Sequence, residues 1–362
     1  MSVEVRQRTV LVTGGMGFIG ANFILHMLKQ DGWRVINLDR LSYAANRANL
    51  TALETDDRHI FVRGDLADRS MVAGLLATHR PSVIVNFAAE THVDRSILKP
   101  AEFVDANVLG TFNLLDETLA FWRDSSAAER ASFRFLHIST DEVYGSLTLD
   151  DQPFDEDDRT KPNSPYAASK AAADHLIRAY HQTYGLPTLI TRCCNNYGPR
   201  QHPEKLIPLM ILKALQREPL PLYGDGLHVR DWLYVEDHCV ALQAVIDRGR
   251  PGHTYNVGGG NEHSNIQVVK MVCSLLDELV PSGAGSYVGL IAHVADRPGH
   301  DRRYAMKSDK VKREVGWQSH ETFATGIRKT VAWYLANGDR VGEASERDGH
   351  YKQWLDLNYA RR

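Results

Sequence analysis

Two stretches of the chain carry residue types that could perform redox chemistry coupled to proton transfer. Thr140, Asp141 and Glu142 follow a short β-prone run that we interpret as a buried parallel strand. Tyr166 and Lys170 lie four residues apart in a segment of helical character, which places both side chains on one face. Ligands bind at the C-terminal edge of the strands in open α/β sheets, so we expect all five residues to meet there.

Each stretch also has an ordinary structural explanation. Asp141 and Glu142 could be a helix N-cap followed by a solvated acid, and Tyr and Lys are common at positions i and i+4 of helices. Both stretches in one chain that also carries a dinucleotide-binding motif favour a catalytic site. Tyr166 with Lys170 beside it could then act as a base. Two neighbouring carboxyl groups could hold different protonation states, because like charges repel each other.

The N-terminal segment predicts that dinucleotide site. A β-run at 9–13 is followed by glycines that include Gly14, Gly17 and Gly20, and then by an amphipathic helix. Glycine lets the backbone turn sharply and approach a pyrophosphate at the helix N-terminus. Asp39 ends the next strand, at the distance where a carboxylate can bind the adenosine ribose and repel a 2′-phosphate. This favours NAD over NADP, although the neighbouring arginine at position 40 weakens the preference.

The next elements predict a doubly wound parallel sheet. Strand-like runs at 59–65 and 82–89 are separated by a helical segment, and strands and helices continue to alternate. Asp65, at the end of the first run, could reach the adenine edge. Thr91 and His92 follow the second run, at the edge that faces ligands. A capped loop ahead of the next helix is the alternative reading of these two residues.

Beyond Asn195 the alternation gives way to loops rich in Pro, Gly and His. We therefore expect an α/β protein with a Rossmann domain over residues 1–195 and a smaller, interleaved substrate-binding domain over residues 196–362. A segment near 230–260 is expected to return to the Rossmann domain. The sequence shows no clean linker, no repeat and no low-complexity segment.

Composition limits the class of partner. The formal net charge of -3 in 362 residues argues against nucleic acid or an anionic membrane. The four cysteines form no CxxC and no zinc spacing, so we expect reduced thiols, mostly in the core, and no metal site. Residues 1–8 contain no signal-peptide core, and no apolar run reaches the roughly 18 residues of a membrane helix. These features predict a cytoplasmic protein.

The motifs together resemble the extended short-chain dehydrogenase/reductases that act on sugar nucleotides. The resemblance rests on the glycines with Asp39, on residues 140–145, and on Tyr166 with Lys170. Epimerases of this family commonly carry a serine and lack the Asp-Glu pair after the fifth strand, whereas both acids are present here. The chain is most similar to the 4,6-dehydratases of the family, through the segments 86–95, 194–208, 223–232 and 296–301.

The resemblance implies a reaction. A dTDP-linked glucose would lose water to give the 4-keto-6-deoxy sugar, with NAD used and regenerated in each turnover. Tyr166, assisted by Lys170, would take the C4 hydroxyl proton while Thr140 binds the C4 oxygen. Glu142 would then take the C5 proton, and a protonated Asp141 would give a proton to the departing C6 hydroxyl.

The resemblance also implies which residues bind the ligands. Those for the cofactor are Gly14, Gly17, Phe18, Ile19, Gly20, Asp39, Arg40, Ser42, Asp65, Leu66, Ala88, Ala89, Tyr166, Lys170 and Asn196. Those for the substrate are Thr91, His92, Thr140, Asn195, Lys205, Leu206, Pro221, Tyr223, Arg230, Asn265, Asp296, Arg297 and His300. Basic side chains suit a diphosphate, and Arg230 is the foremost candidate.

Three alternatives stay open at this point. One is a sugar-nucleotide 4-epimerase or decarboxylase on the same scaffold, another is a dehydratase for a different nucleotide such as UDP, and the third is a non-catalytic NAD(H)-sensing protein.

The resemblance further implies a homodimer that pairs through the helical segments 107–122 and 166–184. Apolar residues of these segments could serve either core or interface: Leu115, Leu119, Leu176 and Ile177.

Overall fold

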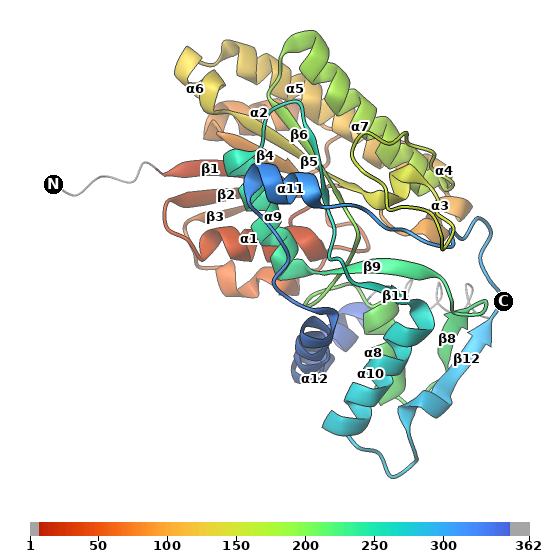
Figure 1. Cartoon of the computed structure of the whole chain (residues 1–362). Helices are drawn as coiled ribbons and strands as arrows, with labels where there is room; N and C mark the ends of the chain where they lie inside the picture. Colours follow the sequence, from red (N-terminus) through yellow and green to blue (C-terminus); the bar gives the residue numbers. More distant parts are fainter. Residues whose placement is uncertain (1–6, 348–362) are drawn as a thin grey trace.

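A seven-stranded parallel sheet forms the larger part of the computed structural model, which describes residues 7–347 (Figure 1). Its strand order is β3-β2-β1-β4-β5-β6-β10. The strands are β1 (Arg8–Thr13), β2 (Trp33–Asp39), β3 (His59–Arg63), β4 (Val83–Asn86), β5 (Arg134–Thr140), β6 (Thr188–Cys193) and β10 (Thr254–Val257). The first six follow the order of a Rossmann sheet, which confirms the predicted fold class.

Helices cover both faces of this sheet, as Figure 1 shows. One face packs against α1 (Phe18–Leu28), α9 (Val235–Arg248) and α11 (Asp309–Val315), and the other against α2 (Arg69–His79), α5 (Gly110–Asp124) and α7 (Pro165–Tyr184). Side chains alternate along each strand, so Val10 and Val12 of β1 enter the first core and Leu11 enters the second. Both faces are buried, which explains why the strands read as continuous apolar runs.

Short helical segments connect these elements. They are η1 (Arg47–Leu53), α3 (Val93–Leu98), α4 (Pro100–Phe103), η2 (Val104–Leu109), α6 (Ala127–Ser132) and η3 (Asp141–Tyr144). The segment predicted as one helix at 107–122 therefore begins with the π-helical turn η2 and continues as α5 to Asp124.

The remaining elements form a second unit, which we call the smaller lobe. It contains β7 (Asn195–Tyr197), β9 (Val229–Tyr234) and β11 (Glu262–Ser264) in one sheet, and β8 (Leu220–Tyr223) and β12 (Ile291–Val294) in another. Its helices are α8 (Leu206–Leu215), α10 (Asn265–Leu279), η4 (Tyr287–Leu290) and α12 (Phe323–Arg347). A separate apolar core holds it together, with Tyr197, Trp232 and Val272 fully or nearly fully buried.

The chain passes between the two units more than once. It leaves the large sheet after β6, returns to it through α9 and β10, and returns again through α11. The last residues of the predicted second domain, 348–362, lie outside the described residues, as do residues 1–6 of the segment used to argue against a signal peptide. Among residues 7–347, none of the helices combines the length and the apolar character that crossing a membrane requires.

The apolar positions left open between core and interface belong to the core. Leu115, Leu119 and Ile177 are buried between the sheet and its helices, and Leu176 packs against the same cluster. These four residues therefore carry no argument for a dimer. The four cysteines, all within the described residues, are buried free thiols, as expected.

Candidate active site

The carboxyl pair lies where β5 ends. Thr140 is the last residue of the strand and caps η3, because its Oγ1 accepts a hydrogen bond from the Glu142 backbone N–H at 3.3 Å. Asp141 is thus not the cap residue that the structural alternative required. Its carboxyl group is buried and accepts a hydrogen bond from Thr140 Oγ1 at 3.2 Å. A threonine cap therefore leaves both acids available for chemistry.

The two acids lie in different electrostatic surroundings. Burial and the neighbouring Glu142 raise the pKa of Asp141 well above its usual range, so the neutral acid is favoured. Burial also raises the pKa of Glu142, but the positive charges of Arg297, Arg230 and Lys205 oppose this rise. The pair is arranged so that Asp141 keeps a proton more readily than Glu142 does.

Tyr166 and Lys170 lie on the buried face of α7. The helix starts at a Ser164 cap, and both side chains are less than 10% exposed. Lys170 Nζ donates a hydrogen bond to the Ile138 carbonyl oxygen at 2.8 Å and lies 3.3 Å from His137 Nε2. These contacts hold the ammonium group against β5, the strand whose C-terminal end carries the carboxyl pair.

The protein alone does not favour an ionised Tyr166. Burial and the negative charge of Glu142 raise the pKa of its phenol well above 10. Burial lowers the pKa of Lys170 to about 8. Tyr166 therefore needs further positive charge in the site before it can act as a base near neutral pH.

Two connected cavities run along the C-terminal edge of the large sheet. The first, of about 240 Å³, is lined by the five predicted catalytic residues, by Gly20 at the start of α1, and by residues of the smaller lobe. The second, of about 80 Å³, is lined by Asp39, Arg40 and Asp65. Both cavities share Gly14, Gly17, Ala44 and Ala89. Each predicted cofactor residue lines one cavity or both.

The glycine turn fits the pyrophosphate of a dinucleotide. Gly14 has φ +71°, and a Cβ atom there would lie 2.7 Å from the Ala88 backbone nitrogen. A Cβ atom at Gly20 would lie 2.4 Å from the Gly14 carbonyl oxygen. Side chains at these positions would push the turn away from β4 and from α1. Without them, the N-terminus of α1 opens onto both cavities.

The end of β2 fits a ribose without a 2′-phosphate. The Asp39 carboxylate accepts hydrogen bonds from the backbone N–H groups of Met16 at 2.9 Å and Leu41 at 2.7 Å, which fix it beside the second cavity. Arg40 is paired with Glu90 and, at 3.3 Å, with Asp65. Its charge is thus already compensated by two carboxylates, which reduces its value for binding a phosphate.

The predicted substrate residues divide into two groups. Thr91, Thr140, Asn195 and Lys205 line the first cavity, and Lys205 Nζ donates a hydrogen bond to the Thr91 carbonyl oxygen at 3.1 Å. The others line neither cavity: His92, Leu206, Pro221, Tyr223, Arg230, Asn265, Asp296, Arg297 and His300. His92 is buried, and burial lowers its pKa to about 4, so this imidazole is neutral near pH 7.

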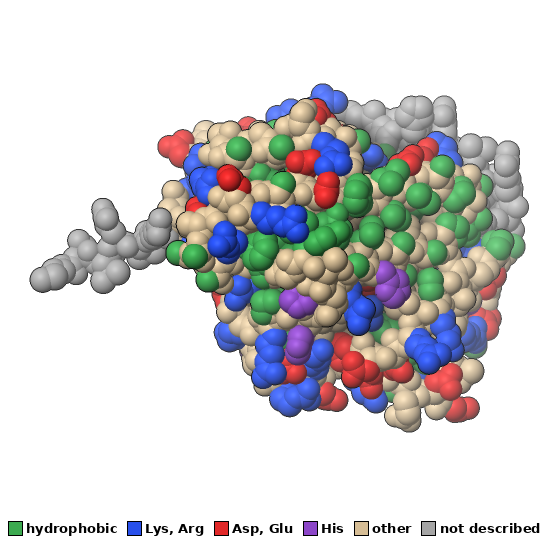
Figure 2. Space-filling model, turned by 90° about the horizontal axis from the view of Figure 1, so that it is seen from above, with side chains coloured by type: hydrophobic (Ala, Val, Ile, Leu, Met, Phe, Trp, Pro, Cys, Tyr) green, Lys and Arg blue, Asp and Glu red, His purple; other side chains and the backbone are tan. Residues whose placement is uncertain are grey.

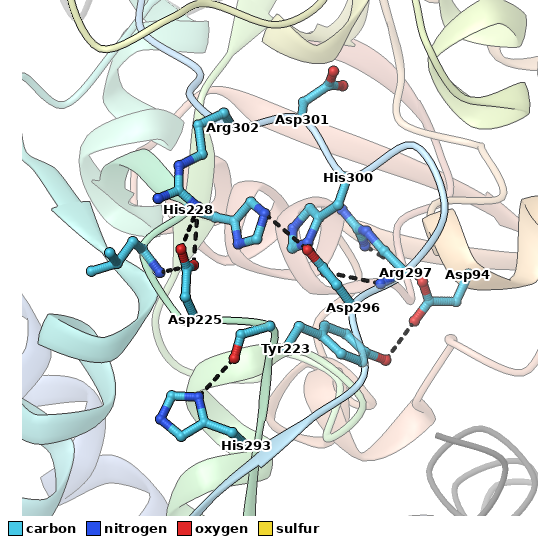
Figure 3. Close-up of polar contacts among 12 residues, drawn as sticks. Asp94, Tyr223, Asp225, His228, His293, Asp296, Arg297, His300, Asp301 and Arg302 are labelled. Atoms are coloured by element: carbon cyan, nitrogen blue, oxygen red, sulfur yellow. Dashed lines mark hydrogen bonds and ion pairs between the residues drawn. The ribbon is translucent and has the colours of Figure 1, made fainter.

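Four residues of the second group, Tyr223, Asp296, Arg297 and His300, lie close together in the smaller lobe (Figure 3). Asp296 Oδ1 accepts a hydrogen bond from His300 Nδ1 at 2.6 Å, and Oδ2 lies 3.2 Å from His228 Nε2. The two imidazole rings stack with centroids 3.6 Å apart at 14°. Burial and the charges of Arg297 and Arg230 lower the pKa of His300 to about 3.

His228, Asp296 and His300 also carry the donor atoms of a possible metal site, which the sequence did not predict. The donor atoms lie within 4.8 Å of one another. The arginines beside them make the surroundings suited to an anion such as a diphosphate.

Arg230 contributes charge as well as contacts. Its guanidinium donates hydrogen bonds to the carbonyl oxygens of Val229 at 2.7 Å and Asp301 at 2.9 Å, and lies over the Tyr304 ring at 4.3 Å. It is 5% exposed, and its positive charge acts on Glu142. The residue expected to bind a diphosphate thus also supports the ionised state of the predicted base.

Sequence reasoning missed several residues at this edge. The first cavity is also lined by Ser139, Cys193, Gln201 and Glu204. His137, on β5, contacts the ammonium group of Lys170. Gln201 and Glu204 belong to the recognised segment 194–208, so that motif could have identified them. His137 and Cys193 lie on strands whose apolar neighbours indicated only a core.

Comparisons with known proteins agree with this geometry. The family model of GDP-mannose 4,6 dehydratase matches residues 11–330. A dTDP-glucose 4,6-dehydratase of Xanthomonas campestris pv. campestris (strain B100) is 55% identical over 330 residues, which cover 91% of this chain and 93% of that protein.

Solved structures show the same relationship. The dTDP-glucose 4,6-dehydratase of Streptomyces venezuelae with NAD and TYD bound matches with a TM-score of 0.84 and 44% identity, covering 93% of this chain and 99% of that one. The enzyme of that name from Bacillus anthracis, in complex with NAD, matches with a TM-score of 0.82 and 41% identity over 93% and 99% of the two chains. On this evidence the chain belongs to the family of the dTDP-glucose 4,6-dehydratases.

Proposed function

We propose that this protein is an NAD-dependent hydro-lyase that converts dTDP-glucose to dTDP-4-keto-6-deoxyglucose. Nearly full-length relatives carry that name, and two of the similar structures hold NAD. The observation that carries the proposal is the arrangement of Asp141 and Glu142. They are adjacent, line the same cavity as Tyr166 and Lys170, and differ in how strongly nearby cations oppose the rise in pKa that burial causes.

The cofactor would lie along the two cavities. The turn at Gly14 and Gly17 would hold its pyrophosphate, Asp39 its adenosine ribose, and Tyr166 with Lys170 its nicotinamide end. Bound NAD would accept a hydride from C4 of the sugar and return it to C6. This placement brings the reacting carbon beside the residues at the end of β5.

The first step belongs to Tyr166. Its phenolate takes the C4 hydroxyl proton, and the positive charge of bound NAD would add to that of Lys170 the stabilisation that the protein alone does not give this base. Thr140, at the end of β5, donates a hydrogen bond to the C4 oxygen. The water-excluding position of all three side chains strengthens these interactions.

Elimination of water belongs to the carboxyl pair. The C4 ketone acidifies the hydrogen on C5, and Glu142 removes it as an ionised base. Neutral Asp141 gives its proton to the departing C6 hydroxyl, so water leaves and a C5–C6 double bond forms. Glu142 finally returns its proton to C5. The cations Arg297, Arg230 and Lys205 oppose the rise in the pKa of Glu142 that burial causes, and so favour its ionised form beside the neutral Asp141.

Incubation of the purified protein with dTDP-glucose, UDP-glucose and GDP-mannose tests this proposal. We expect a 4-keto-6-deoxy product, detected by its absorbance in alkali, with dTDP-glucose preferred. A 4-epimerase would yield a sugar with no ketone, and a UDP-specific dehydratase would reverse the preference. An NAD(H)-sensing protein would bind the dinucleotide and leave every sugar unchanged.

We also propose that the protein is a cytoplasmic homodimer with a Rossmann domain and a sugar-nucleotide-binding domain. Figure 2 views the side of α5 and α7, where hydrophobic side chains gather across the middle of the face. The adjoining elements α3 and η2 expose Leu98 (68%), Val104 (49%) and Leu109 (51%). These residues, and not the buried ones named above, are the apolar surface that a partner subunit would cover.

Sedimentation of the protein and of the double variant Leu98→Glu with Leu109→Glu tests the dimer. We expect the native protein to sediment as a dimer and the variant as a monomer. Leu279→Glu, at a comparably apolar but distant position on α10, should remain dimeric. A native protein whose mass stays monomeric at every concentration would contradict the proposal.

A further inference from the structure

The start of α3 joins the large sheet to the smaller lobe through a buried carboxylate that the proposed reaction does not use. Asp94 lies in the first turn of α3 and is 3% exposed. Tyr223 Oη donates a hydrogen bond to Asp94 Oδ2 at 3.0 Å, and Arg297 Nη1 lies 3.6 Å from Asp94 Oδ1 (Figure 3). One side chain thus contacts the end of β8 and the loop after β12.

Neighbouring residues make the same connection. Arg95 Nε lies 3.2 Å from Glu204 Oε2, whose side chain is fully buried. Two positions before α3, the Thr91 carbonyl oxygen accepts the hydrogen bond from Lys205 Nζ. Residues 91–95, which we call the clasp, therefore reach three separate segments of the smaller lobe.

Two of the partners of the clasp carry a positive charge that reaches the proposed base. Lys205 and Arg297 are cations whose charge acts on Glu142, and Tyr223 lies on the same side of Asp94 as Arg297. A buried carboxylate is costly unless cations or hydrogen-bond donors compensate it. The location of Asp94 in the first turn of α3 stabilises its negative charge in part, because the helix dipole is positive at that end. It does not explain why the two partners come from separate segments of the other lobe.

We propose that Asp94 is a positioning residue for the substrate, which holds Arg297 and Tyr223 in the orientation that binds the nucleotide diphosphate. This inference rests on the proposed function, because it takes the smaller lobe to be the nucleotide site. Asp94 itself touches neither the sugar nor the cofactor. Its removal should therefore weaken the binding of dTDP and leave the chemical steps and the cofactor site intact.

Calorimetric titration with dTDP alone, which needs no turnover, tests the proposal. Asp94→Asn keeps an oxygen that can accept the Tyr223 hydrogen bond but loses the charge that holds Arg297. We expect the Kd for dTDP to rise about tenfold, which corresponds to about 1.4 kcal/mol. The Kd for NAD should stay unchanged. In turnover, KM for dTDP-glucose should rise by a similar factor while kcat changes less than about twofold.

Two further variants separate positioning from packing. Asp225→Asn removes an equal charge from an exposed acid of the same lobe, paired with Arg302 at 2.9 Å, and should leave the Kd for dTDP unchanged. In an Arg297→Gln background, Asp94→Asn should have little additional effect on that Kd, because the group it positions is gone. If Asp94→Asn does not fold, Asp94→Glu, which keeps the charge but displaces it, should weaken dTDP binding at unchanged NAD binding.

Several outcomes would overturn the inference. They are an unchanged Kd for dTDP in the variant, an equal loss of dTDP and NAD binding, and a tenfold loss that persists without Arg297. Failure of the proposed function gives a different pattern, since the native protein would then bind no dTDP or form no ketone.

Discussion

The proposed cofactor groove and the proposed nucleotide region of the smaller lobe are built in different ways. The groove uses the ends of neighbouring parallel strands, with Gly14 after β1, Asp39 at the end of β2 and Ala88 after β4. The nucleotide region uses single residues from distant segments, such as Lys205 and Arg297, which the clasp connects. A repeated architecture would thus position the cofactor, whereas individual tertiary contacts would position the nucleotide of the proposed substrate. We therefore expect chemistry to fail when the sheet edge is changed, and binding to fail when the smaller lobe is changed.

Tyr166→Phe should give the largest effect. The variant lacks the base for C4 oxidation, so the rate of hydride transfer should fall by about 10²–10⁴-fold. Rapid mixing with dTDP-glucose should show no absorbance of reduced nicotinamide, while dTDP binds with native affinity. A variant that still reduces its cofactor at the native rate would remove Tyr166 from its role.

Asp141→Asn should stop the reaction one step later. Asn is nearly isosteric but cannot donate the acidic proton, so loss of water should slow by about 10²-fold while C4 oxidation continues. Reduced nicotinamide should accumulate on the enzyme, in contrast to Tyr166→Phe. Native turnover in this variant would contradict the division of labour between Tyr166 and the carboxyl pair.

The pH dependence of C4 oxidation should report Lys170. Its pKa, lowered by burial from 10.5 to about 8, means that the ammonium charge is lost as pH rises through about 8. The single-turnover rate of cofactor reduction should then fall about tenfold for each further pH unit, as for loss of one required proton.

The fall in the rate of cofactor reduction above pH 8 cannot be explained by unfolding that follows deprotonation of Lys170. Between pH 8 and 10.5 the unfolded chain binds more protons at this lysine than the folded protein does, so the contribution of Lys170 to stability rises with pH. Thermal unfolding measured across the same range should show no loss that coincides with the kinetic limb. A flat rate up to pH 10 would show that the charge of Lys170 is not required.

The preference between NAD and NADP tests the proposed ribose site at the sheet edge, independently of the smaller lobe. The Asp39 carboxylate should repel a 2′-phosphate, and Arg40 is held by Glu90 and Asp65, so the Kd for NADP should exceed that for NAD by at least about tenfold. Titration of the purified protein with each dinucleotide measures this ratio. Equal affinities would refute the role given to Asp39.

The smallest expected effect is that of Arg297→Gln on the pH dependence of water elimination. It tests whether the smaller lobe influences the proposed base at the sheet edge. Arg297 opposes the rise in the pKa of Glu142, so Arg297→Gln should raise that pKa further. Glu142 must be ionised to remove the C5 proton, so the acid limb of water elimination should move to higher pH. Measured at saturating dTDP-glucose, which compensates weaker binding, the rate near pH 6 should fall a few-fold. If the acid limb of the pH–rate profile does not shift in this variant, Arg297 contributes to substrate binding but not to the ionisation of Glu142.

The sequence by itself determined the large sheet, the cofactor side and the five residues proposed for chemistry. Glycine spacing, an acid at a strand end, and the pair Tyr166 and Lys170 on one helical turn are local patterns, and parallel strands bring their C-terminal ends to one edge. The family resemblance that these patterns support implied the full set of cofactor residues, which line the two cavities.

Only the tertiary structure decided the state of the carboxyl pair and the organisation of the smaller lobe. Asp141 and Glu142 are neighbours in sequence, yet their difference in pKa arises from burial and from cations at 205, 230 and 297. The sequence assigned no role to Asp94, because its partners at the end of β8 and in the loop after β12 lie far from it along the chain. Such contacts depend on how two cores pack together, and no periodicity within a single segment records that packing.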